Sequence, residues 1–324
     1  MVGEQCQQRA QRNGDLTFAQ HHPPFAVVST VVDRSLRLAT DTEIAGAALH
    51  RGARQVEIVA GRNSATLRVE PSLRLPVAVP LDHGHQRLGF RASRLGYLRV
   101  VLLLRPPGVY RSDSDTALLI DAMSAGGYAV GRRVLDIGTG TGALALAAAR
   151  AGAVSVTAID LSRRSVAATW INCRIHRVQC TVHRGDLFEP VIGQHFDLIL
   201  ANPPYVPGAT QSLSRHSIRR CWDGGLDGRA VLDRLCTGAA GLLAPEGMML
   251  VVHSAVCDDA VTLRRFTDAG LHADVLARCT IPFGPVMRLR AAMLEARGLI
   301  EPGQRDDELV VIAARAPAGA QRAD

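Results

Sequence analysis

From residue 133 onward, short apolar segments alternate with longer helical ones, and this alternation limits the folds open to the chain more than any other property. Seven segments have the length and composition of strands: residues 133–137, 155–160, 180–185, 196–201, 248–253, 273–278 and 308–314. Segments of helical length separate most of them, which predicts strand–helix–strand units. Such units build a parallel sheet with helices on both faces. We therefore predict a doubly wound α/β fold around a mostly parallel, seven-stranded sheet.

Capping residues indicate where several helices begin and end. Ser114 and Ser162 precede apolar residues at helical spacing, so we expect them to cap helices over residues 115–124 and 162–175. Further helices are expected over residues 227–243, 258–269 and 286–297. The first of these should stop at Pro245, because proline lacks the N–H that a helix needs. The arginine-bearing loop before it, residues 208–222, is expected to be mobile.

The first of these strands runs directly into a glycine-rich loop, residues 138–142, with the sequence Gly-Thr-Gly-Thr-Gly. Glycines let the backbone approach a ligand closely, and the N-terminus of the following helix presents free N–H groups. By itself the loop is consistent with a dinucleotide site or with a tight turn. Asp136 narrows this choice, because a carboxylate just before the glycines suits the ammonium of an amino acid better than a pyrophosphate.

Two further carboxylates stand at the ends of the next strands. Asp160 lies about two dozen residues after Asp136, where a ribose-binding acid is expected, and Asp186 ends the third strand. Any one of these acids alone could simply cap a helix. At the carboxyl ends of successive parallel strands, however, they match an ammonium, a ribose and an adenine amino group in turn. The pattern indicates a nucleoside that carries an amino acid.

The fourth strand ends in Asn202-Pro203-Pro204-Tyr205, here called the proline turn. The two prolines fix φ near −65° and carry no N–H, so the turn is stiff and presents carbonyl oxygens and one carboxamide. These acceptors suit an –NH2 group, and the tyrosine ring offers a flat surface for stacking. Asn-Pro and Pro-Pro are also common in ordinary loops, so the turn gains its meaning from the motifs upstream.

Together these motifs resemble the class I S-adenosylmethionine-dependent methyltransferases that methylate amino groups. More narrowly, the chain is similar to the protein-(glutamine-N5) methyltransferases that act on peptide chain release factors, in the branch without a separate N-terminal helical domain. Val109-Tyr110 with residues 115–119 is similar to the opening motif of that branch, and residues 222–234 to its segment after the proline turn. Ser114 departs from that motif, which usually has an acid there. The resemblance covers residues 106–314 and implies a Rossmann-like fold.

The resemblance also implies a role for each motif. Thr116 and the glycine-rich loop would line the methionine part of S-adenosylmethionine, with Asp136 near its ammonium, and the other two acids would hold the ribose and the adenine. The proline turn would hold and stack on the target amide. The expected catalytic residues are Asn202, Pro203, Pro204 and Tyr205. The expected cofactor-binding residues are Thr116, Asp136, Gly138, Thr139, Gly140, Gly142, Asp160, Leu161, Asp186, Leu187 and Asn202, and no metal ligand or general base is expected.

The distribution of charge separates two classes of acceptor. Residues 1–110 hold 14 arginines against 8 acidic residues, whereas residues 111–324 hold 23 against 22. The part that carries the motifs is thus close to neutral, which disfavours a surface that tracks phosphates. An adenine-N6 or RNA-guanine-N2 methyltransferase is the alternative, because the same turn suits those amines. An inactive cofactor-binding scaffold is disfavoured because the motifs are complete.

The composition and the breaks in pattern divide the chain into three parts. Residues 1–95 form an N-terminal extension, residues 96–316 the methyltransferase domain and residues 317–324 a tail expected to be disordered. The extension has weak strand patterns at residues 27–32, 55–60 and 65–69 and a helix pattern at residues 41–49. It is either a small accessory region or poorly ordered, and we favour poor order.

The remaining features concern compartment and partners. Seven scattered cysteines without a Cys-x-x-Cys pair and the lack of an apolar run of membrane length predict a reduced, cytoplasmic protein with no membrane partner. His21-His22 and the pair His83 and His85 have no cysteine or carboxylate cluster beside them, so we interpret them as loop histidines. The resemblance adds a small activator protein as a further candidate partner.

Overall fold

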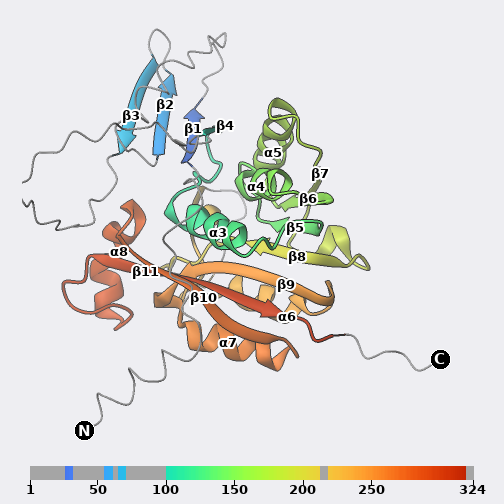
Figure 1. Ribbon diagram of the computed structural model, residues 1–324. Coiled ribbons are helices and arrows are strands. Elements are labelled where there is room, and N and C mark those ends of the chain that lie inside the picture. Colours follow the sequence, from blue (N-terminus) through green and yellow to red (C-terminus); the bar gives the residue numbers. More distant parts are fainter. Residues whose placement is uncertain (1–25, 32–54, 61–64, 71–99, 212–217, 319–324) are drawn as a thin grey trace, which may run out of the picture.

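The computed structural model describes residues 26–31, 55–60, 65–70, 100–211 and 218–318. At its centre lies a seven-stranded sheet with the strand order β10-β11-β9-β8-β5-β6-β7 (Figure 1). The pairs β5–β6, β5–β8, β6–β7 and β8–β9 are parallel, and only β11 pairs antiparallel, with β9 and β10. The predicted doubly wound, mostly parallel fold is therefore confirmed. The predicted helix at residues 41–49 and the two histidine pairs lie outside the described residues.

The strands of this sheet are β5 (Arg133–Ile137), β6 (Ser155–Asp160), β7 (Thr181–Arg184), β8 (Phe196–Ala201), β9 (Leu243–Ser254), β10 (His272–Pro282) and β11 (Asp306–Arg315). The helices are α3 (Ser114–Ala125), α4 (Ala143–Arg150), α5 (Arg163–Ile175), α6 (Leu232–Ala239), α7 (Asp259–Asp268) and α8 (Pro285–Ala296). Three short 3₁₀ helices complete the description: η1 (Glu189–Val191), η2 (Ile218–Cys221) and η3 (Ala255–Cys257).

Side chains of β8 alternate between two apolar clusters, as the period of a strand requires. Leu198 and Leu200 pack with apolar residues of α3 and α4 on one face of the sheet. Ile199 and Ala201 pack with apolar residues of α6 and α7 on the other. β8 is thus buried on both faces, which explains why its sequence is apolar except for Asp197, whose carboxylate pairs with Arg133 at 2.8 Å. The strand holds the proline turn at its carboxyl end.

Several predicted boundaries are wrong. The strand predicted at residues 248–253 begins at Leu243, so Pro245 lies within it, and the strand predicted at residues 273–278 extends to Pro282. Two helix boundaries also differ. The cap of α3 is Asp113, whose side chain accepts from the backbone N–H of Ser114, so Ser114 is the first helical residue; the predicted cap at Ser162 is confirmed. The helix predicted over residues 227–243 is reduced to α6. Gly228 has φ +81°, which breaks a helix, and Leu243 already belongs to β9.

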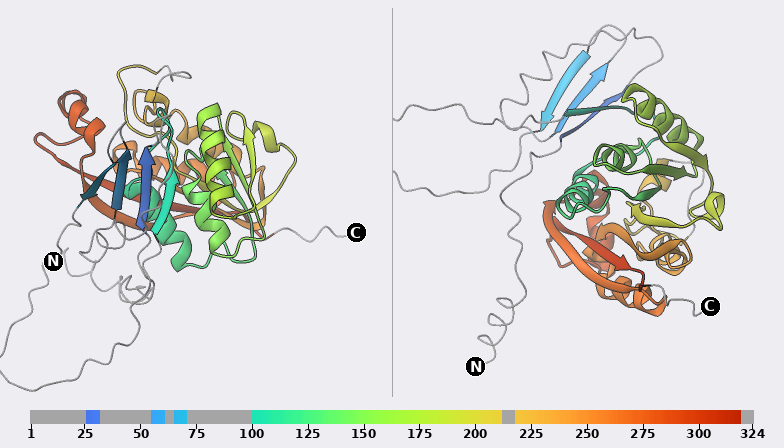
Figure 2. Two further views of the ribbon diagram at one scale, coloured as in Figure 1. Left: turned by 90° about the horizontal axis from the view of Figure 1, so that it is seen from above. Right: turned by 45° about the vertical axis from the view of Figure 1, so that its right-hand side comes forward.

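A second sheet, with the strand order β3-β2-β1-β4, lies beside α5 (Figure 2). Its strands are β1 (Ala26–Val31), β2 (Gln55–Ala60), β3 (Ala65–Glu70) and β4 (Val100–Leu104), so the three strand patterns of the N-terminal extension are confirmed. The end of β4 is tied to α5, because the N–H of Leu104 donates to Asn172 Oδ1 at 2.8 Å and its carbonyl accepts from Asn172 Nδ2 at 3.0 Å. Among the described residues, no helix has both the length and the apolar character to cross a membrane.

Candidate active site

The carboxyl ends of β5, β6 and β8 open onto a cavity of about 430 Å³. This volume lies in the range of pockets for small ligands. Eight of the predicted site residues line it: Gly138, Gly140, Asp160, Leu161, Asp186, Leu187, Asn202 and Pro204. The other predicted residues do not line the cavity: Thr116, Asp136, Thr139, Gly142, Pro203 and Tyr205. Within this second group, Thr116 is bonded directly to a lining residue, because its hydroxyl accepts a hydrogen bond from Asn202.

The glycine-rich loop follows β5 with a backbone that residues with side chains avoid. Gly138, Gly140 and Gly142 have φ values of +72°, +58° and +85°. A Cβ on Gly138 would meet nothing within 4 Å, so this part of the loop borders open space. A Cβ on Gly142 would lie 2.9 Å from Cγ2 of Thr169, so Gly142 allows α5 to pack closely and does not face a ligand. The first two glycines therefore belong to the cavity, and the third to the support behind it.

Asp136, at the end of β5, is fully buried directly behind the glycine-rich loop. Its Oδ2 accepts from the hydroxyl of Thr139 at 2.6 Å and from the N–H of Ala145 at 3.0 Å, while its Oδ1 is buried with no hydrogen-bond partner. Burial raises the pKa of this carboxyl to about 7. A buried oxygen without a partner is costly, so this arrangement fits a cationic group of a ligand.

Asp160 joins the loop to the cavity wall. Its Oδ2 accepts from the N–H of Gly140 at 3.0 Å and its Oδ1 from the N–H of Ser162 at 2.8 Å, and burial raises the pKa of the carboxyl. Each carboxylate oxygen can accept more than one hydrogen bond, so hydroxyl groups of a ligand can still bind. Asp186 lines the cavity and forms an ion pair of 3.1 Å with Arg234, which lies in the first turn of α6.

A chain of hydrogen bonds fixes the side chain of Asn202. The hydroxyl of Thr116 donates to Asp115 Oδ1 at 3.3 Å, and its free lone pair accepts from Asn202 Nδ2 at 3.1 Å. The amide nitrogen of Asn202 is thereby directed at α3. Its carbonyl oxygen, an acceptor, is the group left for the cavity that Asn202 lines.

Asp115 is a site residue that sequence reasoning missed. It is 5% exposed, and its Oδ2 accepts from the hydroxyls of Tyr110 at 2.6 Å and Tyr205 at 3.0 Å. Burial, together with the neighbouring Asp115 carboxylate, raises the pKa of both tyrosine hydroxyls, which keeps them protonated as donors. Its position directly before Thr116 in the opening motif was the one available signal, because 90 residues separate it from Tyr205.

Arg220 is a second residue that the sequence did not indicate. It lies on η2, in the part of the predicted mobile loop that the structure describes, and it lines the cavity. Its Nη2 donates to the carbonyl of Gly108 at 2.9 Å and to the hydroxyl of Ser162 at 2.9 Å. The guanidinium therefore links the segment before α3 to the start of α5 at one side of the cavity.

The chemistry of these groups favours binding and orientation over covalent catalysis. The cavity offers carboxylates for cations and hydroxyls, and a carboxamide oxygen for an N–H donor. Cys221 also lines it, but burial raises the pKa of this thiol to about 11, so it is not a thiolate at neutral pH. The site suits a reaction in which a ligand already carries the activated group.

Comparison with known proteins identifies relatives of this chain. The family model described as methyltransferase small domain matches residues 101–220. The chain is 30% identical over 185 residues to a protein of Methanocaldococcus jannaschii whose name describes it as a protein N5-glutamine methyltransferase, covering 57% of this chain and 92% of that protein. It is 37% identical over 158 residues to the release factor glutamine methyltransferase of Bordetella pertussis, and spans 57% of that relative's length.

In structure, the chain is similar to the Mtq2–Trm112 complex of E. cuniculi, which is responsible for methylation of the eRF1 translation termination factor. The TM-score is 0.46 and the sequence identity 23%, over 64% of this chain and 99% of that chain.

Proposed function

The chain belongs to the family of protein N5-glutamine methyltransferases, and from this membership we propose that it methylates the side-chain amide of a glutamine in a peptide chain release factor. S-adenosylmethionine is the methyl donor of such enzymes. The strongest support from the site is the orientation of Asn202, whose amide nitrogen is engaged by Thr116 and whose oxygen is left to accept from a substrate –NH2. A substrate amide has two N–H donors, one of which can bond to this oxygen.

The residues around the cavity fit S-adenosylmethionine, beginning with the unpartnered oxygen of Asp136. We propose that Asp136 attracts the ammonium of the methionine part, across the glycine-rich loop. Asp160 and Leu161 would hold the ribose, and Asp186 with Leu187 the adenine. A buried water could also satisfy this oxygen. The proton release on donor binding that is predicted in the Discussion distinguishes a water from the ammonium.

The proposed mechanism follows from the weakness of the nucleophile. An amide nitrogen shares its lone pair with the carbonyl, so it attacks poorly unless it is held and polarised. S-adenosylmethionine supplies, when bound, a methyl group already activated by a positive sulfur. Asn202 Oδ1 and the Pro203 carbonyl would accept the two amide hydrogens, which favours electron density on nitrogen and fixes its direction. The ring of Tyr205 would pack on the amide, and the proton would leave to solvent after transfer.

The test is incubation of the purified chain with methyl-labelled donor and either a release factor or bulk nucleic acid. Mass spectrometry of the release factor should find one added methyl on a glutamine side chain, and none with Asn202→Ala. Label in nucleic acid and none in the release factor would overturn the proposed acceptor and favour an adenine-N6 or guanine-N2 methyltransferase. The arginine-rich residues 1–110 are the feature that keeps this second acceptor under test.

Further proposals depend on this assignment. We propose residues 96–316 as the catalytic domain and residues 1–95 as an N-terminal extension, whose strand β1 pairs with β4. We propose the cytoplasm as the place of action, because release factors work in translation. The need for a small activator protein stays a prediction. Methyl-transfer assays of the chain alone and with a candidate activator would test it.

A further inference from the structure

Asp115 holds the hydroxyl of Tyr205, and a second set of residues holds its backbone carbonyl. The thiol of Cys257, the last residue of η3, donates to this carbonyl oxygen at 3.0 Å. Gly228 lies against the same oxygen: a Cβ there would be 2.3 Å from Tyr205 O and 2.6 Å from Cys257 Sγ. Only glycine fits at position 228, so the backbone and the thiol together enclose the carbonyl.

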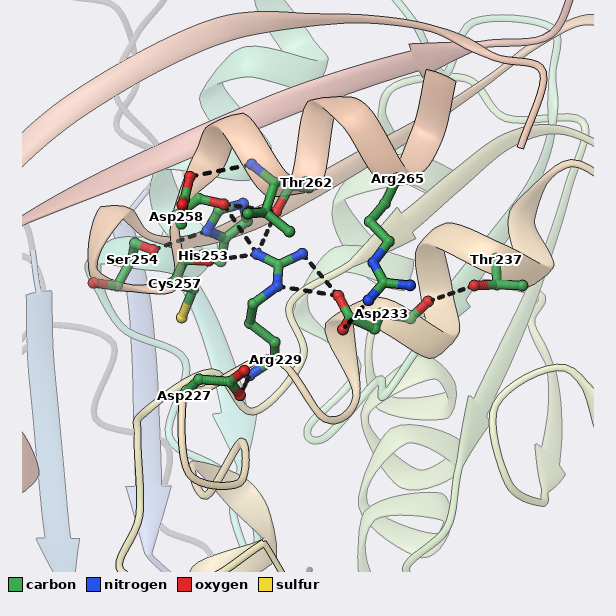
Figure 3. Close-up of polar contacts among 11 residues, drawn as sticks. Asp227, Arg229, Asp233, Thr237, His253, Ser254, Cys257, Asp258, Thr262 and Arg265 are labelled. Carbon is green, nitrogen blue, oxygen red and sulfur yellow. Dashed lines mark hydrogen bonds and ion pairs between the residues drawn. The ribbon is translucent and has the colours of Figure 1, made fainter. Parts of the chain in front are cut away.

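Arg229 follows Gly228, and its side chain donates to groups of four residues. It is 6% exposed, and its Nη1 donates to the carbonyls of Cys257 and Asp258 and to the hydroxyl of Thr262, the last two at 3.0 Å (Figure 3). Its Nε and Nη2 donate to Asp233 Oδ1 at 3.1 and 2.8 Å. A buried guanidinium with this many fixed acceptors resists displacement of any one of them.

These contacts form one continuous path from α6 to the proline turn. Asp233, in the first turn of α6, holds the guanidinium of Arg229, as the close-up shows, and Arg265 of α7 pairs with the same carboxylate at 3.2 Å (Figure 3). Arg229 in turn holds the backbone of Cys257. The Cys257 thiol then holds the carbonyl of Tyr205, whose hydroxyl is already fixed by Asp115.

We propose that Arg229 and Cys257 are positioning residues for the proline turn. Arg229 sets the position of η3, and the thiol of Cys257 fixes the peptide of Tyr205, so that the oxygens of Asn202 and Pro203 stand where a substrate amide must bind. The proposal rests on the proposed methyltransferase function. It adds two residues that act through others and touch no ligand.

The thiol suits this role because it stays a donor. Burial raises the pKa of Cys257 well above its ordinary value, so the group remains S–H at any pH at which the protein is assayed. Beyond the turn, the N–H of Val206 donates to the carbonyl of Trp222 at 2.7 Å, and the N–H of Gly208 to that of Gly225 at 2.7 Å. Exchange of these two amides therefore reports whether the turn has loosened, with no acceptor substrate needed.

Cys236 provides a matched control. It is a fully buried thiol on α6, in the same apolar cluster as Cys257, and no hydrogen bond joins it to the proline turn. If Cys257 only fills space, Cys257→Ala and Cys236→Ala should lower stability alike and leave kcat of the folded enzyme equal. If Cys257 positions the turn, only its loss should lower kcat.

The experiment compares Cys257→Ala, Cys257→Ser and Cys236→Ala at a temperature at which circular dichroism shows each to be folded. We expect Cys257→Ala to lower kcat about tenfold, less than the hundredfold that an ångström of misplacement can cost, with donor Kd within about twofold. Its Val206 amide should exchange faster, and Cys257→Ser, which keeps a donor, should recover most of both losses. An unchanged kcat in Cys257→Ala, or an equal loss in Cys236→Ala, would overturn the proposal.

Arg229→Lys tests the other end of the path. Lysine keeps the charge but not the planar fork of hydrogen-bond donors. We therefore expect Arg229→Lys to have a lower kcat than the unsubstituted protein and faster exchange of the Val206 amide, again with donor Kd little changed. Normal exchange at Val206 in this variant would remove Arg229 from the path. If the unmodified chain fails to methylate a release factor, the proposed function fails, while the exchange measurements still decide whether these residues hold the turn.

Discussion

The two glycine-containing loops of the site use glycine for opposite reasons. In the glycine-rich loop, Gly138 has φ +72° and a Cβ there would meet nothing within 4 Å, so its surroundings are left open. In the second glycine loop, residues 224–229, a Cβ on Gly224 would lie 2.4 Å from the carbonyl oxygen of Gly228, and one on Gly228 would lie 2.3 Å from that of Tyr205. Gly138 of the first loop leaves space at the cavity, whereas the glycines of the second loop allow protein to pack on protein.

Under the proposed function, this difference divides the site into a donor side, which would admit S-adenosylmethionine, and an acceptor side, which would hold the proline turn in place. Changes on the donor side should therefore affect the binding of S-adenosylmethionine. Changes on the acceptor side should affect turnover and stability. Any variant that violates this division shows that the two sides are mechanically coupled.

The largest expected effect is on the acceptor side. Asn202→Ala removes the oriented amide oxygen, and we expect kcat to fall by at least about a hundredfold, the scale for one fixed catalytic hydrogen-bonding group. Donor affinity, measured by isothermal titration calorimetry, should change much less. Asp160→Ala is the matched donor-side variant and should mainly raise donor Kd. Equal loss of donor binding in both variants would contradict the division.

The second prediction compares an alanine substitution at one glycine of each loop. Gly228→Ala places a methyl group against the Tyr205 carbonyl at a positive φ, so we expect the free energy of unfolding to fall by about 2 kcal/mol, with lower kcat in the folded fraction. Gly138→Ala meets no atom and should cost only about 1 kcal/mol from its φ. Urea denaturation compares the two.

Donor affinity gives the complementary result for this pair. The methyl group of Gly138→Ala would enter the space beside the cavity, so donor Kd should rise, whereas Gly228→Ala should leave it unchanged. Equal destabilisation by the two substitutions would mean that the second glycine loop is as loosely packed as the first.

The donor side was predictable from the sequence because each of its parts is local. Asp136, the glycines that follow it in the sequence and Asp160 stand at strand ends, and parallel strands bring such positions together without further information. Their contacts bear this out in part: Gly140 is bonded to Asp160 across only 20 residues. What the sequence did not indicate is that Gly142 and Thr139 act behind the lining, because that depends on how closely α5 and Asp136 approach them.

The acceptor side was predictable only as far as the proline turn itself. The residues that hold the turn come from distant segments: Asp115 lies 90 residues before Tyr205, and Cys257 lies 52 residues after it. Expecting one helix over residues 227–243 also concealed Arg229, because a helical residue would have been interpreted as part of an exposed surface. A hydrogen bond between segments of such separation leaves no local pattern to recognise.

The third prediction concerns the protonation of Asp136. The folded-state pKa of about 7 lies above the ordinary value of 3.8, so folding favours the protonated carboxyl. The stability that this contributes is complete below the ordinary pKa and is lost as the pH rises through about 7, by up to about 1.4 kcal/mol per pH unit. Asp136→Asn cannot ionise and should remove this part of the slope, as urea denaturation at about pH 5 and about pH 8 would measure.

Binding of the donor should reverse the preference. An ammonium across the glycine-rich loop from Asp136 favours the carboxylate, so calorimetry in buffers of different ionisation enthalpy should detect proton release on binding below about pH 7. Absence of proton release, with normal affinity in Asp136→Asn, would mean that a water and not the ammonium satisfies Oδ1.

The smallest expected effect lies where the two sides meet. Arg220 links Gly108 and Ser162 at the cavity, and its loss removes two hydrogen bonds of about 1 kcal/mol each at most, weakened by partial exposure. We expect Arg220→Ala to raise donor Kd about threefold to tenfold with kcat unchanged, because the link spans the donor side. Arg219→Ala, at an exposed position of the same 3₁₀ helix, is the control. A fall in kcat with unchanged Kd would instead assign this helix to the acceptor side, and the boundary between the two sides would then run between Arg220 and Asp160.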